Sequence, residues 1–189
     1  MLRPVAQGVT LVEMMVGLAI ISCLLLVGMP SFSQWIQDLQ IRGAAESVQS
    51  ALLLARSEAI RRNRPVRLRL NDAGGLVEWE VGCVTVTADC PAGIARRSRN
   101  EGGRNARMAA GAMANADSLA SPLAPGSGLP ASLDFNGLGA VIGAAPGRIE
   151  ISHAALGGAR RLVLLIGGGG LIRLCNPALA RNASPQGCA

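Results

Sequence analysis

The N-terminal part of the chain holds an apolar run that constrains every other interpretation. Residues 9–29 read VTLVEMMVGLAIISCLLLVGM, contain Glu13 as their single charged residue, and are followed by Pro30. A helix of this length measures about 31 Å at 1.5 Å per residue, which matches the hydrocarbon core of a bilayer. The run is longer than the roughly 7–15 apolar residues of an ordinary signal peptide, and only Arg3 precedes it. It therefore predicts a membrane-spanning helix over residues 9–30.

Glu13 is the unexpected residue of this run. An ionisable side chain inside a membrane span is costly and by default marks a function. One interpretation is that Glu13 lies near the edge of the bilayer and extends its carboxylate to water. The other is that Glu13 pairs with a cation at the same depth, such as a freed α-amino group on the helix of a neighbouring subunit.

The segment from Gly8 to Glu13, with the apolar run and Pro30 behind it, resembles the prepilin signal of type IV pilins and type II secretion pseudopilins. In that family a short leader ends in Gly, a dedicated inner-membrane peptidase cuts after it, and the fifth mature residue is Glu. The span usually ends in Pro at mature position 22. The first mature residue is usually Phe, where this chain has Val9.

The resemblance implies a role for each matching residue. Residues 1–8 would be a leader that is removed, with Gly8 as the recognition residue of the prepilin peptidase. Val9 would be the cleaved and N-methylated terminus. Glu13 would set the register of the subunit in a filament by pairing with a neighbour's terminal amine, and Pro30 would kink the helix.

Residues 31–64 predict an amphipathic continuation of this helix. Apolar residues recur there at three- and four-residue steps, and Gln, Asp, Arg and Glu fill the other face. Arg61 and Arg62 stand at the negative end of the helix dipole, and Pro65 ends the helix.

The remainder, residues 65–189, predicts a β-rich globular domain. Residues 91–131 combine scattered Arg with Ala, Ser, Pro and Gly, which predicts a long, poorly ordered loop. The alternation elsewhere predicts an antiparallel sheet packed on the long helix, and so an α+β fold. The expected strands are residues 66–70, 76–81, 84–87, 133–135, 140–142, 148–152, 161–166 and 171–175.

Four cysteines lie outside the apolar run, which itself contains Cys23. In an exported domain they favour two disulfides among three pairings. The local pairing, Cys83–Cys90 with Cys175–Cys188, is favoured because each pair lies within one short segment. Free thiols and a metal site are the alternatives, although the chain has no CxxC spacing and a single histidine, His153.

The second half resembles the GspH/FimT family, which contains minor pseudopilin H of type II secretion and minor pilin T of type IV pili. The resemblance rests on the motifs 135–139 (FNGLG), 147–151 (GRIEI) and 170–175 (GLIRLC), with a closing Cys188. It implies the type IV pilin-like fold and a structural, non-enzymatic subunit without cofactors. Its expected place is the bacterial inner membrane, as a single-pass protein with a periplasmic domain that enters a pilus or pseudopilus. Its expected partners are the prepilin peptidase, other pilins or pseudopilins, and the inner-membrane assembly platform.

Binding of DNA for natural transformation is the alternative function. The formal net charge is +6, and all 18 basic residues are Arg. Some members of the subgroup bind DNA through arginines near the C-terminal loop, where this chain has Arg160, Arg161, Arg173 and Arg181. However, those members usually carry Gly-Arg-x-Arg where this chain reads Gly170-Leu171-Ile172-Arg173. An enzyme is not expected, because the sequence shows no acid–base constellation and no nucleophile motif.

Overall fold

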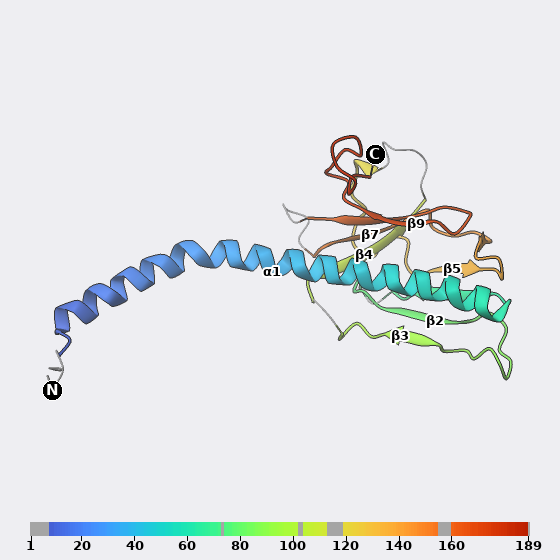
Figure 1. Ribbon diagram of the computed structural model, residues 1–189, viewed down its shortest axis with the longest axis horizontal. Helices are drawn as coiled ribbons and strands as arrows, with labels where there is room; N and C mark the ends of the chain where they lie inside the picture. The colour runs from blue at the N-terminus through green and yellow to red at the C-terminus, as the bar shows by residue number, and fades with distance from the viewer. Residues whose placement is uncertain (1–7, 73, 102–103, 113–118, 155–159, 189) are drawn as a thin grey trace, which may run out of the picture. The chain divides into compact units, whose positions relative to one another are not determined.

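The computed structural model describes residues 8–72, 74–101, 104–112, 119–154 and 160–188, except for the side chains of residues 27–31. The chain forms two compact units, Met1–Ile36 and Gln37–Ala189. Helix α1 (Leu11–Arg62) begins in the first unit and ends in the second (Figure 1). The continuous N-terminal helix predicted from the sequence is therefore present.

The first unit consists of a short non-helical segment and the N-terminal part of α1. The residues from Val9 to Leu26 are exposed, apart from Gly17, which is half-buried. Within the described residues, no helix has both the length and the hydropathy that crossing a membrane requires. The predicted kink at Pro30 falls on a side chain outside the described residues.

In the second unit, α1 buries a stripe of mostly small side chains. Ile41, Val48 and Leu52 are fully buried, and alanines fill the positions between and beyond them. Because these side chains recur every three or four residues, they lie on one face of the helix. Small residues on that face let the strands approach the helix closely. The buried alanines are Ala44, Ala45, Ala51, Ala55 and Ala59.

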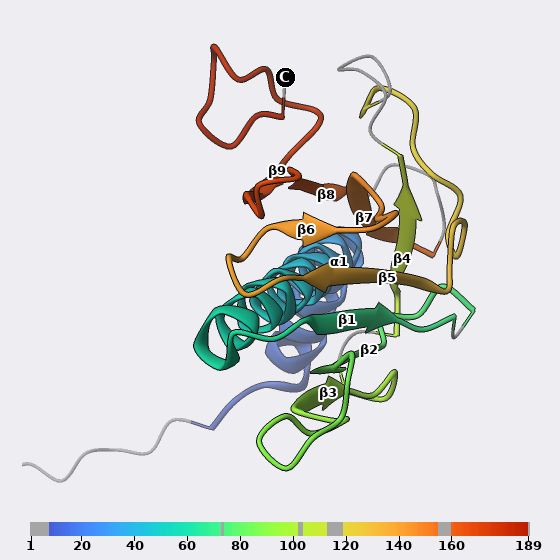
Figure 2. The same cartoon turned by 90° about the vertical axis from the view of Figure 1, so that its right-hand side faces the viewer.

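Two antiparallel sheets pack on this stripe (Figure 2). The first sheet has the strand order β3-β2-β1-β5-β6, and the second has the order β4-β7-β8-β9. In the first sheet the strands are β1 (Val66–Leu70), β2 (Trp79–Cys83), β3 (Ala95–Arg97), β5 (Ala131–Phe135) and β6 (Val141–Ile142). In the second sheet they are β4 (Ala106–Gly111), β7 (Arg148–His153), β8 (Leu162–Ile166) and β9 (Ile172–Cys175).

One apolar core joins α1 to both sheets. Leu68 of β1, Phe135 of β5 and Ile151 of β7 are fully buried in it beside the helix stripe. Every buried apolar side chain in the described part of the chain belongs to the second unit. This unit therefore holds a hydrophobic core of its own.

The α+β class and the antiparallel pairing predicted from the sequence are confirmed, but two local predictions are wrong. Residues 84–87 are not a strand; they lie in the loop between Cys83 and Cys90, where Thr87 forms an isolated bridge to Cys90. Residues 91–131 are not one long loop, because β3 and β4 lie within them. Within that range, residues 102–103 and 113–118 fall outside the described residues. The strands also form two sheets where the sequence indicates one.

The sequence predicts only that the helix ends at Pro65. In the structure, α1 ends at Arg62 in a hydrogen-bonded cap. Asn63 has a φ of 50°, and its N–H donates to the carbonyl of Ile60 at 3.2 Å. The N–H of Arg64 donates to the carbonyl of Ala59, also at 3.2 Å. These two bonds form a Schellman motif, with Asn63 as the left-handed residue just beyond the helix.

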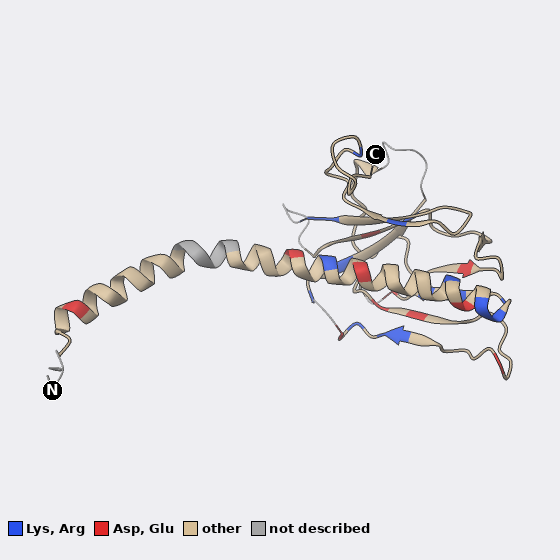
Figure 3. Cartoon of the chain, in the orientation of Figure 1, with Lys and Arg blue, Asp and Glu red and all other residues tan. Residues whose placement is uncertain are grey.

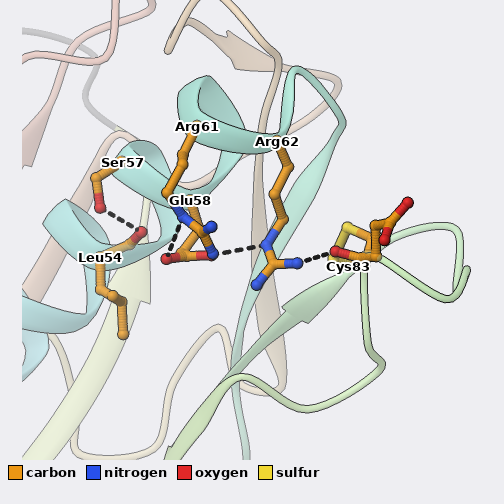
Figure 4. A network of polar contacts seen from close by, with 8 residues as sticks. Leu54, Ser57, Glu58, Arg61, Arg62 and Cys83 are labelled. Carbon is orange, nitrogen blue, oxygen red and sulfur yellow. Dashed lines mark hydrogen bonds and ion pairs between the residues drawn. A yellow bond between two sulfur atoms is a disulfide. The ribbon is translucent and has the colours of Figure 1, made fainter.

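Glu58 connects the last turn of α1 to two arginines (Figure 4). Arg61 donates through Nη2 to Glu58 Oε2 at 2.6 Å, and Arg62 donates through Nε to the same oxygen at 2.7 Å. Arg62 also donates to the carbonyl of Asp89, next to the Cys83–Cys90 disulfide. The helix end is thereby tied to the disulfide loop.

We expect acid to weaken this tie. The hydrogen bonds from Arg61 hold the pKa of Glu58 below its ordinary value. A carboxyl whose pKa is lower in the folded chain adds stability above its unfolded pKa, and this stability is lost as the pH falls through the folded pKa. Glu58→Gln should therefore destabilise the protein at neutral pH, and its difference from wild type should shrink in acid.

Urea unfolding of both proteins over a range of pH measures that difference. Glu46→Gln is the matched control, because Glu46 lies 3.8 Å from Arg42 and both side chains are more than half exposed. Such a surface pair contributes little. A wild-type advantage over Glu58→Gln that stays constant into strong acid would contradict the prediction.

Two turns meet beside the end of α1. Residues 136–140 join β5 to β6, and residues 167–171 join β8 to β9. The N–H of Val141 donates to the carbonyl of Gly168 at 2.9 Å, which links the two sheets. Gly170 has a φ of 79°, and a Cβ added there would overlap the carbonyl oxygen of Gly139. The two turns can touch only because Gly170 has no side chain.

Gly170→Ala should therefore lower the free energy of unfolding by about 2–5 kcal/mol, from the left-handed backbone and from the overlap. Gly169→Ala is the control, because a Cβ at Gly169 meets nothing within 4 Å. That change should stay within about 0.5 kcal/mol of wild type. Chemical denaturation of the two variants measures the contrast, and equal stabilities would exclude the proposed contact.

Candidate assembly segment and surface arginines

The residues before α1 form an exposed segment. Gly8, Val9 and Thr10 are non-helical and exposed, and the helix begins at Leu11. The N–H of Glu13 donates to Thr10 Oγ1 at 3.3 Å, and the N–H of Met14 donates to the Thr10 carbonyl at 3.2 Å. Thr10 is therefore the N-cap, and the bond between Gly8 and Val9 lies outside the helix.

Thr10 is a residue that the sequence-based prediction missed. The spacing Thr10-Leu-Val-Glu13 is the Ser/Thr-x-x-Glu signature of a capping box, and this signature could have located the start of the helix. It also gives Glu13 a third interpretation. A carboxylate in the first turn is favourable at the positive end of the helix dipole, whether or not it pairs with another subunit.

The cysteines form two disulfides at the pairing that the sequence favours. Cys83 pairs with Cys90 with a Cα–Cα distance of 5.7 Å, and Cys175 pairs with Cys188 with a distance of 5.0 Å. Cys23 is a free, exposed thiol. Among the described residues, no group of three or more His, Cys, Asp or Glu is arranged to hold a metal ion.

The second disulfide lies on the face of the second sheet that points away from α1. Val163 and Leu165 of β8 alternate with the core residue Leu164, and Val163 packs with Leu119, Cys175 and Cys188 in a small separate cluster. The C-terminal segment is also held by the N–H of Asn176, which donates to the carbonyl of Gln186 at 2.7 Å. The disulfide-closed tail therefore covers apolar surface of the sheet.

Two sequence profiles match the chain. The profile of the family described as type II transport protein GspH matches residues 44–170, which is more than half of the chain. The chain belongs to the GspH family. The profile of the prokaryotic N-terminal methylation motif matches residues 3–29, which include Gly8, Val9 and Glu13. No curated protein sequence gives a significant match.

Solved structures with a similar fold are pilin-like subunits. The minor pseudopilin EpsH from the type 2 secretion system of Vibrio cholerae is 14% identical, with a TM-score of 0.50, over 74% of this chain and 99% of its own. The type IV minor pilin FimU of Pseudomonas aeruginosa is 19% identical, with a TM-score of 0.48, over 76% of this chain and 93% of its own. At such identities, a likeness concerns the fold alone. The likeness to EpsH therefore shows a shared fold, a long helix packed on antiparallel sheets.

Arg161, one of the four arginines considered for DNA contact, is half-buried. It lies directly before β8, and its Nη1 is 3.1 Å from Oε2 of Glu150, whose side chain is fully buried on β7. Its Nη2 donates to the carbonyls of Leu119 and Ala120, while the N–H of Leu123 donates to Glu150 Oε1 at 3.2 Å. Arg161 and Glu150 together therefore hold residues 119–123 against the second sheet.

Arg173 also contacts its own chain. It lies on β9, and its Nη2 donates to the carbonyls of Gly187 and Pro185 in the disulfide-closed tail. The other two, Arg160 and Arg181, are exposed. Leu171, which stands where DNA-binding members carry an arginine, is 71% exposed. The structure therefore gives two of the four predicted contacts an internal role, which does not favour DNA binding.

We expect Arg161 to matter for stability in a way that Arg160 does not. Arg161→Met leaves the buried carboxylate of Glu150 without its cation, which should cost about 3–5 kcal/mol of unfolding free energy. Adding Glu150→Gln to that variant should recover part of the loss, because the unpaired charge is then gone. Arg160→Met should stay within about 0.5 kcal/mol of wild type.

Chemical denaturation of the three variants measures these differences. Equal stability of Arg161→Met and Arg160→Met would show that the Glu150–Arg161 pair is not needed for the fold. No recovery in the double variant would show that the loss comes from packing rather than from the buried charge.

Proposed function

We propose that the chain is a minor pilin-like subunit that is cut after Gly8, N-methylated at Val9 and built into a type IV pilus or a type II secretion pseudopilus. The observation that carries the proposal is the N-terminal methylation motif over residues 3–29 in a chain that belongs to the GspH family. The exposed, non-helical segment from Gly8 to Thr10 supports it, because a peptidase needs access to extended backbone.

Before assembly, residues 9–30 would hold the subunit in the bacterial inner membrane with its globular domain in the periplasm. The two disulfides of the second unit fit an oxidising compartment. The prepilin peptidase, the assembly platform and other pilin-like subunits would be its partners. Its role would be structural, as a subunit that helps to prime or cap the filament.

Glu13 would act in assembly, beyond its part in the helix cap. After cleavage, a terminal ammonium exists on each neighbouring subunit, and its pairing with Glu13 would neutralise two charges in an apolar surrounding. Glu13→Gln separates the two roles, because Gln at this position of a capping box can still bond back to the N-cap while carrying no charge.

Mass spectrometry of the mature N-terminus tests the proposal in cells that contain the peptidase and the filament machinery. We expect the wild-type chain to begin at a methylated Val9 and to appear in the sheared or purified filament fraction. Gly8→Val should leave an uncut chain in the membrane. Glu13→Gln should be cut after Gly8 and yet be depleted from filaments about tenfold or more.

Two outcomes would contradict the proposal. A wild-type chain that keeps Met1, or one cut beyond Ser31, would exclude prepilin processing. Filaments that take up Glu13→Gln as well as wild type would leave processing intact but would exclude charge pairing as the function of Glu13. Thr10→Ser, which retains the capping hydroxyl, is the matched control and should behave as wild type.

A further inference from the structure

The end of the second unit at which α1 terminates exposes apolar side chains next to arginines. We call this the helix-end surface and define it by residues 56–65, 83–90, 136–142 and 167–171. In both views the last turn of α1 and the loops built from these residues gather at one end of the domain (Figures 1 and 2). All of these residues belong to the second unit and lie in its described part.

Six large apolar side chains are exposed on this surface, the two least exposed being Val84 and Ile142. Leu138 is 86% exposed, Leu171 71%, Val86 61% and Ile60 48%. A single exposed leucine needs no explanation, but adjoining ones mark contact sites. Leu138 directly precedes Gly139 and Leu171 directly follows Gly170, so the two leucines belong to turns that touch each other.

The backbone holds these leucines outward. The N–H of Gly139 donates to the carbonyl of Asn136 at 2.8 Å, and the N–H of Gly167 donates to the carbonyl of Leu171 at 2.9 Å. A Cβ at Gly139 would lie 2.8 Å from Cδ1 of Ile60, so the turn rests directly on the helix. Because the turns are fixed, little conformational entropy is lost when a partner covers the leucines.

The charge of the helix-end surface is positive. Its four segments contain four arginines, at positions 56, 61, 62 and 64, against the two acids Glu58 and Asp89. Glu58 already pairs with Arg61 and Arg62, and Arg64 is exposed. In Figure 3 the ribbon near the end of α1 is coloured for several arginine positions.

We propose that the helix-end surface binds the surface of an anionic lipid bilayer. Leu138 and Leu171 enter the boundary between headgroups and acyl chains, and the exposed Arg64 faces the lipid phosphates. Projecting apolar residues surrounded by cations are the features by which proteins bind such interfaces. A nucleic acid would use the arginines and leave both leucines in water, so the leucines favour the lipid.

Vesicle co-sedimentation tests the proposal with the fragment Gln37–Ala189, which contains the whole described core and both disulfides. This fragment lacks the apolar run, which would insert into any bilayer. The vesicles contain phosphatidylcholine alone, or phosphatidylcholine and phosphatidylglycerol in equal parts. We expect about tenfold more binding to the anionic vesicles at low ionic strength, and less at physiological ionic strength.

Substitutions separate the apolar part of vesicle binding from the electrostatic part. Leu138→Ser with Leu171→Ser should reduce vesicle binding about tenfold without changing the unfolding midpoint, because both side chains are exposed. Arg64→Gln should reduce the preference for anionic vesicles about threefold to fivefold. Leu179→Ser is the matched control, since Leu179 is 37% exposed and lies in the disulfide-closed tail. It should bind as wild type.

Three results would overturn the proposal. The first is a folded fragment that stays in the supernatant with anionic vesicles at low ionic strength. The second is binding that survives the leucine double substitution, which would indicate non-specific attraction to polyanions. The third is a concentration-dependent dimer that the double substitution abolishes while vesicle binding is absent, which would assign the surface to protein contact.

Discussion

The close approach of two β-sheets to one helix is the constraint on which the rest of the second unit depends. The chain has two Phe, two Trp and no Tyr, so its core has few large rings. Small residues on the helix make up for the missing rings. Five buried alanines on α1 bring the sheets near enough for Leu, Ile and Val to fill the remaining space. A larger residue on that face would push both sheets away at once. The same helix exposes apolar residues in the first unit, so one element serves two different surroundings.

The ends of the sheets are closed by polar and covalent contacts instead of by more apolar core. The Cys83–Cys90 loop is tied to the end of α1 by Arg62, and the Cys175–Cys188 tail is tied to β9 by Arg173. The buried pair of Glu150 and Arg161 fixes a third segment on the second sheet. Arginine suits each of these places, since its planar group donates to several carbonyls while it stays charged. Some arginines of this chain therefore hold its loops and tail in place, in addition to those that charge its surface.

The long helix and most of the strands could be predicted, because apolar periodicity identifies both. The strand β4 could not, since its buried residues are Ala106, Met108, Ala109 and Ala110, and these mostly small residues among Arg and Gly do not alternate with polar ones. The role of Arg161 could not be read from the sequence either. Its partner Glu150 lies on a neighbouring strand, and only the pairing of β7 with β8 brings the two together. Thr10 differs from these, because its capping signature was visible in the sequence.

The contact between Gly139 and Gly170 limits how the helix-end surface can vary between related chains. The shape of the two turns depends on the glycines, whereas what the turns present to a partner depends on Leu138 and Leu171 beside them. Shape and chemistry are thus encoded at separate, adjacent positions. A substitution at an exposed leucine changes what this end presents to a partner without refolding the turn. Evolution, or a protein engineer, can therefore replace the specificity of this end while keeping the same scaffold.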